Sequence, residues 1–196
     1  MNLSKIEIVT NRLLLKPIAM QYKSEIFREF TNEIAIYMTP RPAIDIFETE
    51  SFINESITGL TEGSNLQLVI IKKDTQEFLG CTGIHNLNAK APSLHPDSHP
   101  DSHPEFGIWL KKSAHGNCYG IETIRALKEW AEENLDIDYL IYPVDRDNYP
   151  SRRIPERLGG IIVKEYDKQS LSGNTLHLVE YKLLNNPKSS LTSKNY

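Results

Sequence analysis

This sequence of 196 residues has few cysteines, no long apolar stretch and no excess of positive charge. Its two cysteines, Cys81 and Cys118, are fewer than a disulfide-framed secreted domain contains, which predicts a reducing, cytoplasmic location. The N-terminus lacks a signal-peptide stretch, and apolar runs such as Leu68–Ile71 are far shorter than a membrane span. We therefore expect a soluble intracellular protein.

The formal net charge is -4, so no overall positive field attracts nucleic acid. Basic residues cluster only briefly, at Lys111–Lys112 and Arg152–Arg153. Nucleic acid and membranes are therefore not expected as partners. The chain has 196 residues, of which 39% are hydrophobic, and this is enough to bury one core. We expect a single domain over residues 1–185, with a loop insertion at 88–104 and a flexible tail at 186–196.

Hydrophobic periodicity predicts an α+β fold, with a mixed, largely antiparallel sheet of six to seven strands and about four helices. The helices are expected at Met20–Thr31, after an Asp45 cap up to Gly59–Gly63, at Gly120–Leu135 and at Pro150–Leu158. The strands are expected at Ile6–Ile18, Leu66–Lys73, Glu77–Leu87, Phe106–Leu110, Tyr139–Val144, Ile161–Tyr166 and Thr175–Leu184. Pro143 suggests a strand end or a bulge.

A near-tandem HPDS repeat places His95, His99 and His103 four residues apart. Its prolines exclude a continuous helix, and in an extended conformation four residues span about 12 Å, too far for two imidazoles to share one zinc easily. Successive turns would bring them closer, so a metal site stays an alternative. We expect no metal, and interpret the repeat as an irregular loop.

The segment HGNCYG, residues 115–120, lies between a strand and the clearest helix of the chain. Glycines at a helix start let backbone N–H groups approach an anion, and the helix dipole favours negative charge there. The segment is neither a Walker loop nor a GxGxxG fingerprint. On spacing alone it is either a pyrophosphate site or an ordinary strand–turn–helix connection.

The stretch EFGIWLKKSAHGNCYGIETIRALKEWA resembles the acetyl-CoA-binding motif of the GNAT acetyltransferase superfamily, especially its RimJ/RimL-type branch. Three further stretches are similar to that family: TNRLLLKPI, GCTGIHNL and DRDNYPSRRIPERLGG. The resemblance covers about residues 8–183 in the family's order of elements. It implies a GNAT fold and acetyl-CoA as cosubstrate.

By this resemblance, two stretches bind coenzyme A. The edge of the strand Ile108–Leu110 would hold the pantetheine arm and the thioester, and backbone groups of His115–Gly120 would cradle the pyrophosphate. The residues implied in cofactor binding are Ile108, Trp109, Leu110, His115, Gly116, Asn117, Cys118, Tyr119, Gly120, Asn148 and Ser151. His115 replaces the motif's arginine or glutamine, and Cys118 replaces a glycine. We expect Cys118 to have a negative φ, at the start of the helix, and binding to survive.

The resemblance also implies the chemistry. Glu105 stands where the family often has a carboxylate acting as base, although a solvated charge at a strand end is the alternative. Ser151 matches a serine near the CoA sulfur and is the candidate proton donor, or else a helix-start hydrogen-bonding group. His85 is a candidate substrate-binding residue, with a partly buried, hydrogen-bonded histidine as the alternative. Tyr37 lies in a loop expected to set acceptor specificity.

We therefore expect an N-acetyltransferase that moves an acetyl group from acetyl-CoA directly to a primary amine, such as a protein N-terminus. The alternatives are a small amine (a polyamine, amino acid or aminoglycoside) and a non-catalytic acyl-CoA-binding module. The expected partners are acetyl-CoA and the amine acceptor, with the protein a monomer or a homodimer. The insertion before Glu105 is expected to shape the entry of the acceptor.

Overall fold

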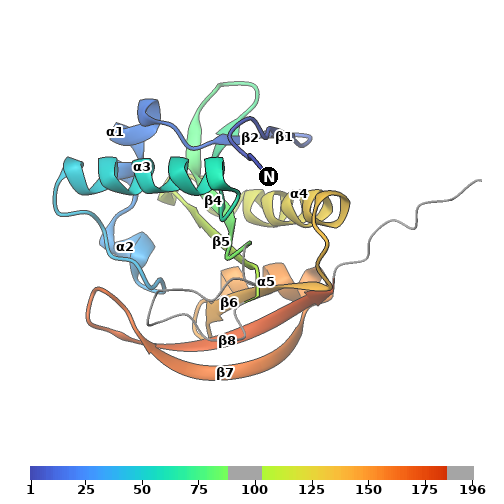
Figure 1. Cartoon of the computed structure of the whole chain (residues 1–196). Coiled ribbons are helices and arrows are strands. Elements are labelled where there is room, and N and C mark those ends of the chain that lie inside the picture. Colours follow the sequence, from blue (N-terminus) through green and yellow to red (C-terminus); the bar gives the residue numbers. More distant parts are fainter. Residues whose placement is uncertain (88–102, 185–196) are drawn as a thin grey trace, which may run out of the picture.

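A computed structural model describes residues 1–87 and 103–184, which form one curved eight-stranded sheet with helices on both faces (Figure 1). The strands are β1 (Ile8–Val9), β2 (Leu13–Pro17), β3 (Leu66–Lys72), β4 (Phe78–His85), β5 (Glu105–Leu110), β6 (Tyr139–Asp145), β7 (Ile161–Gln169) and β8 (Thr175–Leu184). The α-helices are α1 (Lys23–Glu29), α2 (Asn32–Ala35), α3 (Ile46–Glu62), α4 (Tyr119–Asn134) and α5 (Tyr149–Arg157). Single 3-10 turns lie at η1 (Met20–Tyr22) and η2 (Lys112–Ala114).

The sheet has the order β1-β2-β3-β4-β5-β6-β8-β7. All neighbouring strands are antiparallel except β5 and β6, which are parallel. The predicted α+β class and the mixed, largely antiparallel sheet are confirmed. The hairpin of β7 and β8 curls away from the other strands and leaves β7 at the edge of the sheet (Figure 1).

Two boundaries differ from the sequence prediction. The strand expected over Ile6–Ile18 is two strands, because a tight turn forms where the Thr10 N–H donates to Leu13 O (2.9 Å). The segment after Thr31, expected to be a loop, begins with the short helix α2, where the Thr31 side chain accepts the N–H of Ile34 at 3.4 Å. These two features account for the eighth strand and the fifth α-helix of the described residues.

Helix α3 confirms its predicted start and end signals. The Asp45 carboxylate accepts the N–H groups of Phe47 (2.8 Å) and Glu48 (3.1 Å), which satisfies donors that the first helical turn leaves free. Gly63 ends the helix in a left-handed conformation at φ 76°.

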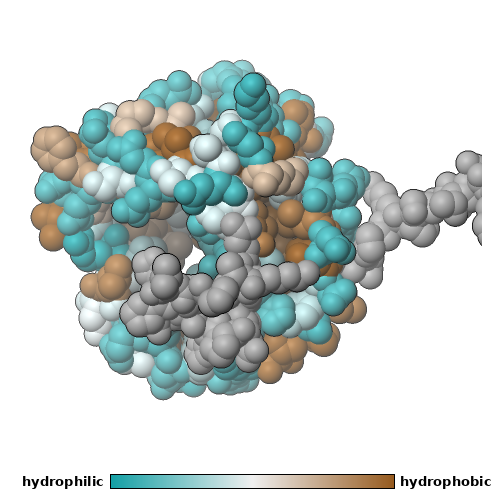
Figure 2. Space-filling view, viewed as in Figure 1, coloured by the Kyte–Doolittle hydropathy of each residue, from teal (hydrophilic) through white to brown (hydrophobic). Residues whose placement is uncertain are grey.

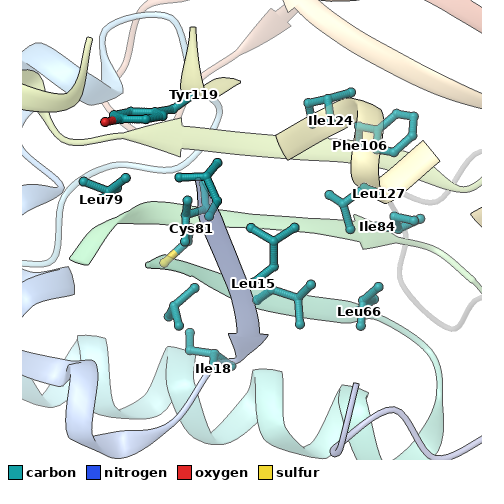
Figure 3. Packing of buried hydrophobic residues seen from close by; sticks show 14 of the residues in the cluster. Leu15, Ile18, Leu66, Leu79, Cys81, Ile84, Phe106, Tyr119, Ile124 and Leu127 are labelled. Carbon is teal, nitrogen blue, oxygen red and sulfur yellow. The ribbon is translucent and has the colours of Figure 1, made fainter. Parts of the chain in front are cut away.

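Apolar side chains fill both faces of the central strands (Figure 3). Ile124 and Leu127 of α4 lie on the same side as Phe106, while Ile18 lies toward α3. The central strands β3 and β4 are buried almost throughout, which explains their nearly continuous apolar sequences. The core thus holds β4 and β5 in a fixed position between two layers of helices.

The predicted insertion 88–104 lies outside the described residues, except for His103 and Pro104, and so does the tail 186–196. Among the helices in the part of the chain that the structure describes, none is long and apolar enough to cross a membrane.

Candidate active site

Strand β5 is paired unequally with its two neighbours. All six of its residues are in register with β4. Within residues 1–87 and 103–184, a single residue of β5 is in register with β6: Glu105, opposite Ile141. The two parallel strands therefore separate beyond Glu105, and this opens a gap along the rest of β5.

The backbone groups that face this gap follow from the hydrogen-bond alternation of β5. Lys111 N–H donates to Leu79 O (2.8 Å), so odd-numbered residues of this strand turn their backbone groups toward β4. Ile108 and Leu110 consequently direct their N–H and C=O groups toward the gap. Trp109 directs its backbone toward β4 instead, where it pairs with Cys81.

Pro143 lies inside β6 and neither ends the strand nor forms a bulge, contrary to the sequence prediction. It is in register with Glu180 of β8 within an unbroken run of paired residues. Arg146 N–H donates to His177 O (2.8 Å), so position 143 faces β5 and not β8. Because proline has no N–H, the β6 side of the gap carries no unpaired donor there.

The loop after β5 turns sharply before α4 begins. Gly116 and Cys118 both have positive φ, 77° and 61°. The Asn117 side chain donates to the carbonyls of Ala114 (3.2 Å) and His115 (3.0 Å), which holds the turn. The negative φ expected for Cys118 is wrong: this residue is the left-handed N-cap of α4, where a glycine carries no steric cost.

His115 connects this loop to β5 through its side chain. Its ring Nε2 lies 2.9 Å from Leu110 O, a carbonyl that faces the gap. Tyr119 and Gly120 begin α4, and both are buried. A Cβ on Gly120 would lie 3.0 Å from the Ile154 side chain, so this glycine allows α4 to pack against α5. The predicted pyrophosphate loop and the predicted pantetheine strand are thus contiguous.

Two further predicted residues lie at the start of α5. The Asn148 side chain caps this helix by accepting the Ser151 N–H at 3.3 Å. The Ser151 hydroxyl lies 2.9 Å from the Tyr142 hydroxyl. Burial raises the pKa of Tyr142 to about 12, against the opposing effect of the Ser151 hydrogen bond, so the phenol stays protonated at neutral pH. Tyr142 was not among the predicted site residues, because its place in YLIYPV indicated only a buried strand position.

A cavity of about 380 Å³ lies on the other side of β4 and β5, beneath α1 and α3. Figure 2 shows the molecule hollowed between the part that carries these helices and the β7–β8 hairpin. Leu171 N–H donates to Thr39 O (2.8 Å), so the turn of this hairpin contacts the loop after α2. The walls are mostly apolar and are formed by Ile26, Phe27, Phe30, Met38, Pro40, Arg41, Ala43, Glu48, Thr49, Phe52, Gln67, Cys81, Thr82, His85, Gly107, Ile108, Trp109 and Leu171.

Of the residues predicted to bind the acceptor, His85 lines this cavity. Tyr37 does not line it, although its neighbour Met38 does. Trp109 packs with Phe30 at a ring-centroid distance of 5.1 Å and forms an aromatic wall. The side chain of Trp109 therefore lies on the cavity side of β5, opposite α4.

Glu105 lies directly across from His85 in the β4–β5 register but is not itself a lining residue. Burial raises the pKa of the Glu105 carboxyl, the positive charge of Lys168 opposes this, and the negative charge of Glu180 adds to it. Glu105 is therefore more basic than an exposed glutamate.

Arg41 and Glu48 form an ion pair at 2.9 Å in the cavity wall, which the sequence did not reveal. Hydrogen bonds from Arg41 and, to a smaller extent, from the Ile44 N–H lower the pKa of Glu48 to about 2. The sequence indicated only a capping box at Glu48. Its carboxylate instead binds Arg41, seven residues earlier, a pairing that no local pattern indicates.

Histidines of the HPDS repeat other than His103 lie outside the described residues. His103 stacks on Tyr139 at a centroid distance of 4.4 Å and also hydrogen bonds to its hydroxyl. Residues 1–87 and 103–184 contain no group of three or more His, Cys, Asp or Glu side chains that could hold a metal ion.

Three solved structures are similar to this chain along almost its whole length. RimL, a ribosomal-protein alpha-N-acetyltransferase in complex with coenzyme A, has a TM-score of 0.75 at 16% identity over 91% of this chain and 98% of that one. Spermidine N-acetyltransferase from Vibrio cholerae, with CoA and spermine, has 0.73 at 14% identity over 91% and 98%. The microcin self-immunity acetyltransferase MccE, with acetyl-CoA and AMP, has 0.72 at 19% over 89% and 93%.

The TM-scores show a shared fold, and at these identities the likeness shows the fold alone. No curated protein matches the chain. The family model described as an acetyltransferase (GNAT) domain matches residues 12–161, which include β2 to β6, the gap beside β5, the loop before α4 and all of α5. The chain therefore belongs to the GNAT family of acetyltransferases.

Proposed function

We propose that this acetyl-CoA-dependent N-acetyltransferase acts on the N-terminal amine of a protein, with acetyl-CoA entering through the gap between β5 and β6. The observation that carries the proposal is the backbone edge of Ile108 and Leu110, which faces the gap and lies between the α4 N-terminus and the 380 Å³ cavity. This arrangement supports a cosubstrate on one side of β5 and an acceptor on the other.

Acetyl-CoA would bind mainly through backbone groups. The backbone N–H groups of Ile108 and Leu110, and the carbonyl of Ile108, face the gap and would pair with the pantetheine arm, much as with a further strand. The loop His115–Gly120 offers N–H groups at the positive end of the α4 dipole, which suits a pyrophosphate. His115 supports the same site because its contact with Leu110 O joins the loop to the strand.

The reaction needs a free amine, a polarised thioester carbonyl and a proton for the thiolate that leaves. The amine nitrogen attacks the thioester carbon, the C–N bond forms, and the C–S bond breaks. An N–H group of the free β5 edge would polarise the carbonyl. Ser151 would donate the proton to the thiolate and recover it from Tyr142, its 2.9 Å neighbour, or from solvent. The Glu105 carboxylate, whose pKa is raised, would act as a base on the side of β5 proposed for the acceptor.

The charges of the cavity favour an acceptor with a single ammonium group. Among lining residues in the described part of the chain, Glu48 is the one carboxylate, and Arg41 already pairs with it. The further ammonium groups of a polyamine would find no free anion on these walls. Aromatic and aliphatic side chains instead suit the body of an amino-terminal residue. RimL, a structural neighbour, acetylates a protein alpha-amine, whereas spermidine N-acetyltransferase represents the alternative.

The test is thiol release from acetyl-CoA with a matched set of acceptors, checked by the mass of the product. The set contains peptides beginning with serine or alanine, the same peptides blocked at the N-terminus, spermidine, and a free amino acid. We expect turnover with the unblocked peptides and none with the blocked ones. Faster turnover of spermidine would contradict the acceptor class. CoA binding without turnover of any amine would favour the binding-module alternative.

A further inference from the structure

His85 is an ionisable side chain of the cavity that lies against β5, the strand with the open edge. It lies at the end of β4, with Gly107 of β5 beside it. A methyl group added to Gly107 would stand 2.8 Å from His85 Nε2, so the ring covers the position where a side chain is missing. Ile108, whose N–H faces the gap, is the next residue along the strand. The imidazole therefore lies where the cavity approaches the predicted thioester position.

No contact in the described residues explains why a histidine occupies this position. The ring has neither a hydrogen bond nor an ion pair with any residue of 1–87 or 103–184, so the hydrogen-bonded histidine of the alternative interpretation is not observed. His85 is only partly buried, and its ring nitrogens are not among the buried polar atoms that lack a partner in the described residues, so the ring is accessible from the cavity that it lines. An acceptor amine in the cavity would be a partner for it.

The charged groups around His85 support a neutral ring that gains a proton during the reaction. Burial lowers the pKa of His85, so the imidazole is a free base at neutral pH. Arg41 and Glu48 compensate each other across the cavity. Cys81, the other ionisable lining residue of β4, is fully buried, and burial raises its pKa. Glu105 of β5 lies directly opposite His85 in the β4–β5 register.

We propose that His85 is the catalytic residue that takes the proton from the acceptor amine, and that Glu105 acts behind it by stabilising the imidazolium. This rests on the proposed acetyl transfer. As the amine nitrogen bonds to the thioester carbon, one N–H proton passes to the free nitrogen of His85, and the C–S bond breaks. The thiolate of CoA receives a proton from Ser151. Ser151 then recovers a proton from solvent and protonated His85 releases its proton to solvent, so no group is consumed.

The experiment compares His85→Gln, His85→Ala and Glu105→Gln using acetyl-CoA and the peptide beginning with serine, or the best acceptor of the set. We expect His85→Gln to lower kcat about a hundredfold or more, the range of general base catalysis, with acetyl-CoA affinity unchanged. The rate of the His85→Gln variant should rise with pH until the acceptor amine itself is deprotonated. The part of the wild-type pH dependence that comes from His85 should be lost. Added imidazole should restore at least a tenth of the activity of His85→Ala. Glu105→Gln should have the smaller effect.

His177→Gln is the matched control, since His177 lies on β8, pairs with Asp167 at 2.7 Å and does not line the cavity. It should keep wild-type kinetics. Near-normal kcat and pH profile in His85→Gln, with activity abolished in Glu105→Gln, would overturn the inference and leave acetyl transfer standing. An inactive His85→Ala that binds CoA but does not respond to imidazole would also count against it. A wild-type protein that acetylates no amine would remove the inference together with the proposed function.

Discussion

Cys118 adopts a strained backbone conformation in the loop that is proposed to bind the coenzyme. It has φ 61°, a conformation that costs a residue with a side chain roughly 1–2 kcal/mol and glycine almost nothing. We expect Cys118→Gly to raise the free energy of unfolding by about 1 kcal/mol, or the melting temperature by ~2–4 °C. Thermal unfolding followed by circular dichroism measures this. A lower melting temperature would show that the thiol makes a compensating contact.

Ser151 combines a structural and a chemical role that a substitution can separate. Its backbone N–H is the group that Asn148 caps, so Ser151→Ala keeps the cap and removes only the hydroxyl beside Tyr142. We expect kcat to fall about tenfold or more while the KM for acetyl-CoA stays unchanged, since proton donation acts in the transition state. Steady-state kinetics with both substrates measure this. A raised KM with unchanged kcat would assign Ser151 to binding.

At the scale of elements, Pro143 keeps the β6 side of the gap free of a donor. Alanine at this position adds an N–H that faces β5. We expect Pro143→Ala to keep the β8 ladder and to promote pairing between β5 and β6. The dissociation constant for acetyl-CoA should rise about fivefold, the equivalent of one competing hydrogen bond. Isothermal titration calorimetry measures the affinity. Unchanged binding would show that the curvature of the sheet alone holds the strands apart.

A second contact between elements joins the β1–β2 turn to the first turn of α4. The Glu122 carboxylate accepts hydrogen bonds from the Thr10 hydroxyl (2.6 Å), the Arg12 backbone N–H (2.9 Å) and the Arg12 side chain (2.8 Å). Burial acts to raise the pKa of Glu122, but the hydrogen bonds from Thr10 and Arg12 outweigh it, and the pKa is lowered. The carboxylate thus stabilises the fold when it is ionised.

Glu122→Gln should lower the free energy of unfolding by about 1 kcal/mol at pH 7. Because the folded pKa lies below the unfolded one, the contribution of Glu122 is present above about pH 4 and disappears as the pH falls through the folded pKa. Chemical unfolding at pH 7 and at pH 3 therefore should show a difference between variant and wild type that shrinks in acid. An equal difference at both pH values would contradict the role of the ionised carboxylate. Glu165→Gln, at an exposed position, serves as the control.

The elements themselves were predictable where local patterns specify them. Asp45 and Gly63 mark both ends of α3, and the apolar stripe of α4 predicts its length to within one residue at each end. The turn that divides β1 from β2 was missed because Thr10 and Asn11 interrupt an apolar stretch without a glycine or proline. Pro143 misled the prediction because its effect depends on which neighbour its missing N–H faces, and that is a property of the sheet.

The sequence indicates only the part of the candidate site that is proposed for the coenzyme. The loop before α4 and the edge of β5 are contiguous in sequence, so a single motif contains both. The cavity proposed for the acceptor instead gathers residues from distant elements: Arg41 and Glu48 from the α2–α3 region, His85 from β4 and Leu171 from the β7–β8 turn. No spacing in the sequence indicates that these meet. For the same reason, His85 could not be distinguished from an ordinary buried histidine without the cavity.

Across the whole molecule, β5 separates two chemical environments. On one side, backbone donors and a helix N-terminus suit an anionic coenzyme; on the other, His85 lines a mostly apolar cavity. Gly107, the glycine of β5, has no side chain to separate the two sides. With the substrates bound as proposed, the thioester and the base would approach each other at this strand, as direct transfer requires.

The most direct measurement of this account is the mass of an unblocked peptide after incubation with the protein and acetyl-CoA, together with the thiol released. Direct transfer predicts a gain of one acetyl group on the N-terminal amine and one equivalent of CoA thiol for each acetylated peptide. Thiol release that is the same with blocked and unblocked peptides, with no acetylated product, would contradict acetyl transfer to a protein N-terminus.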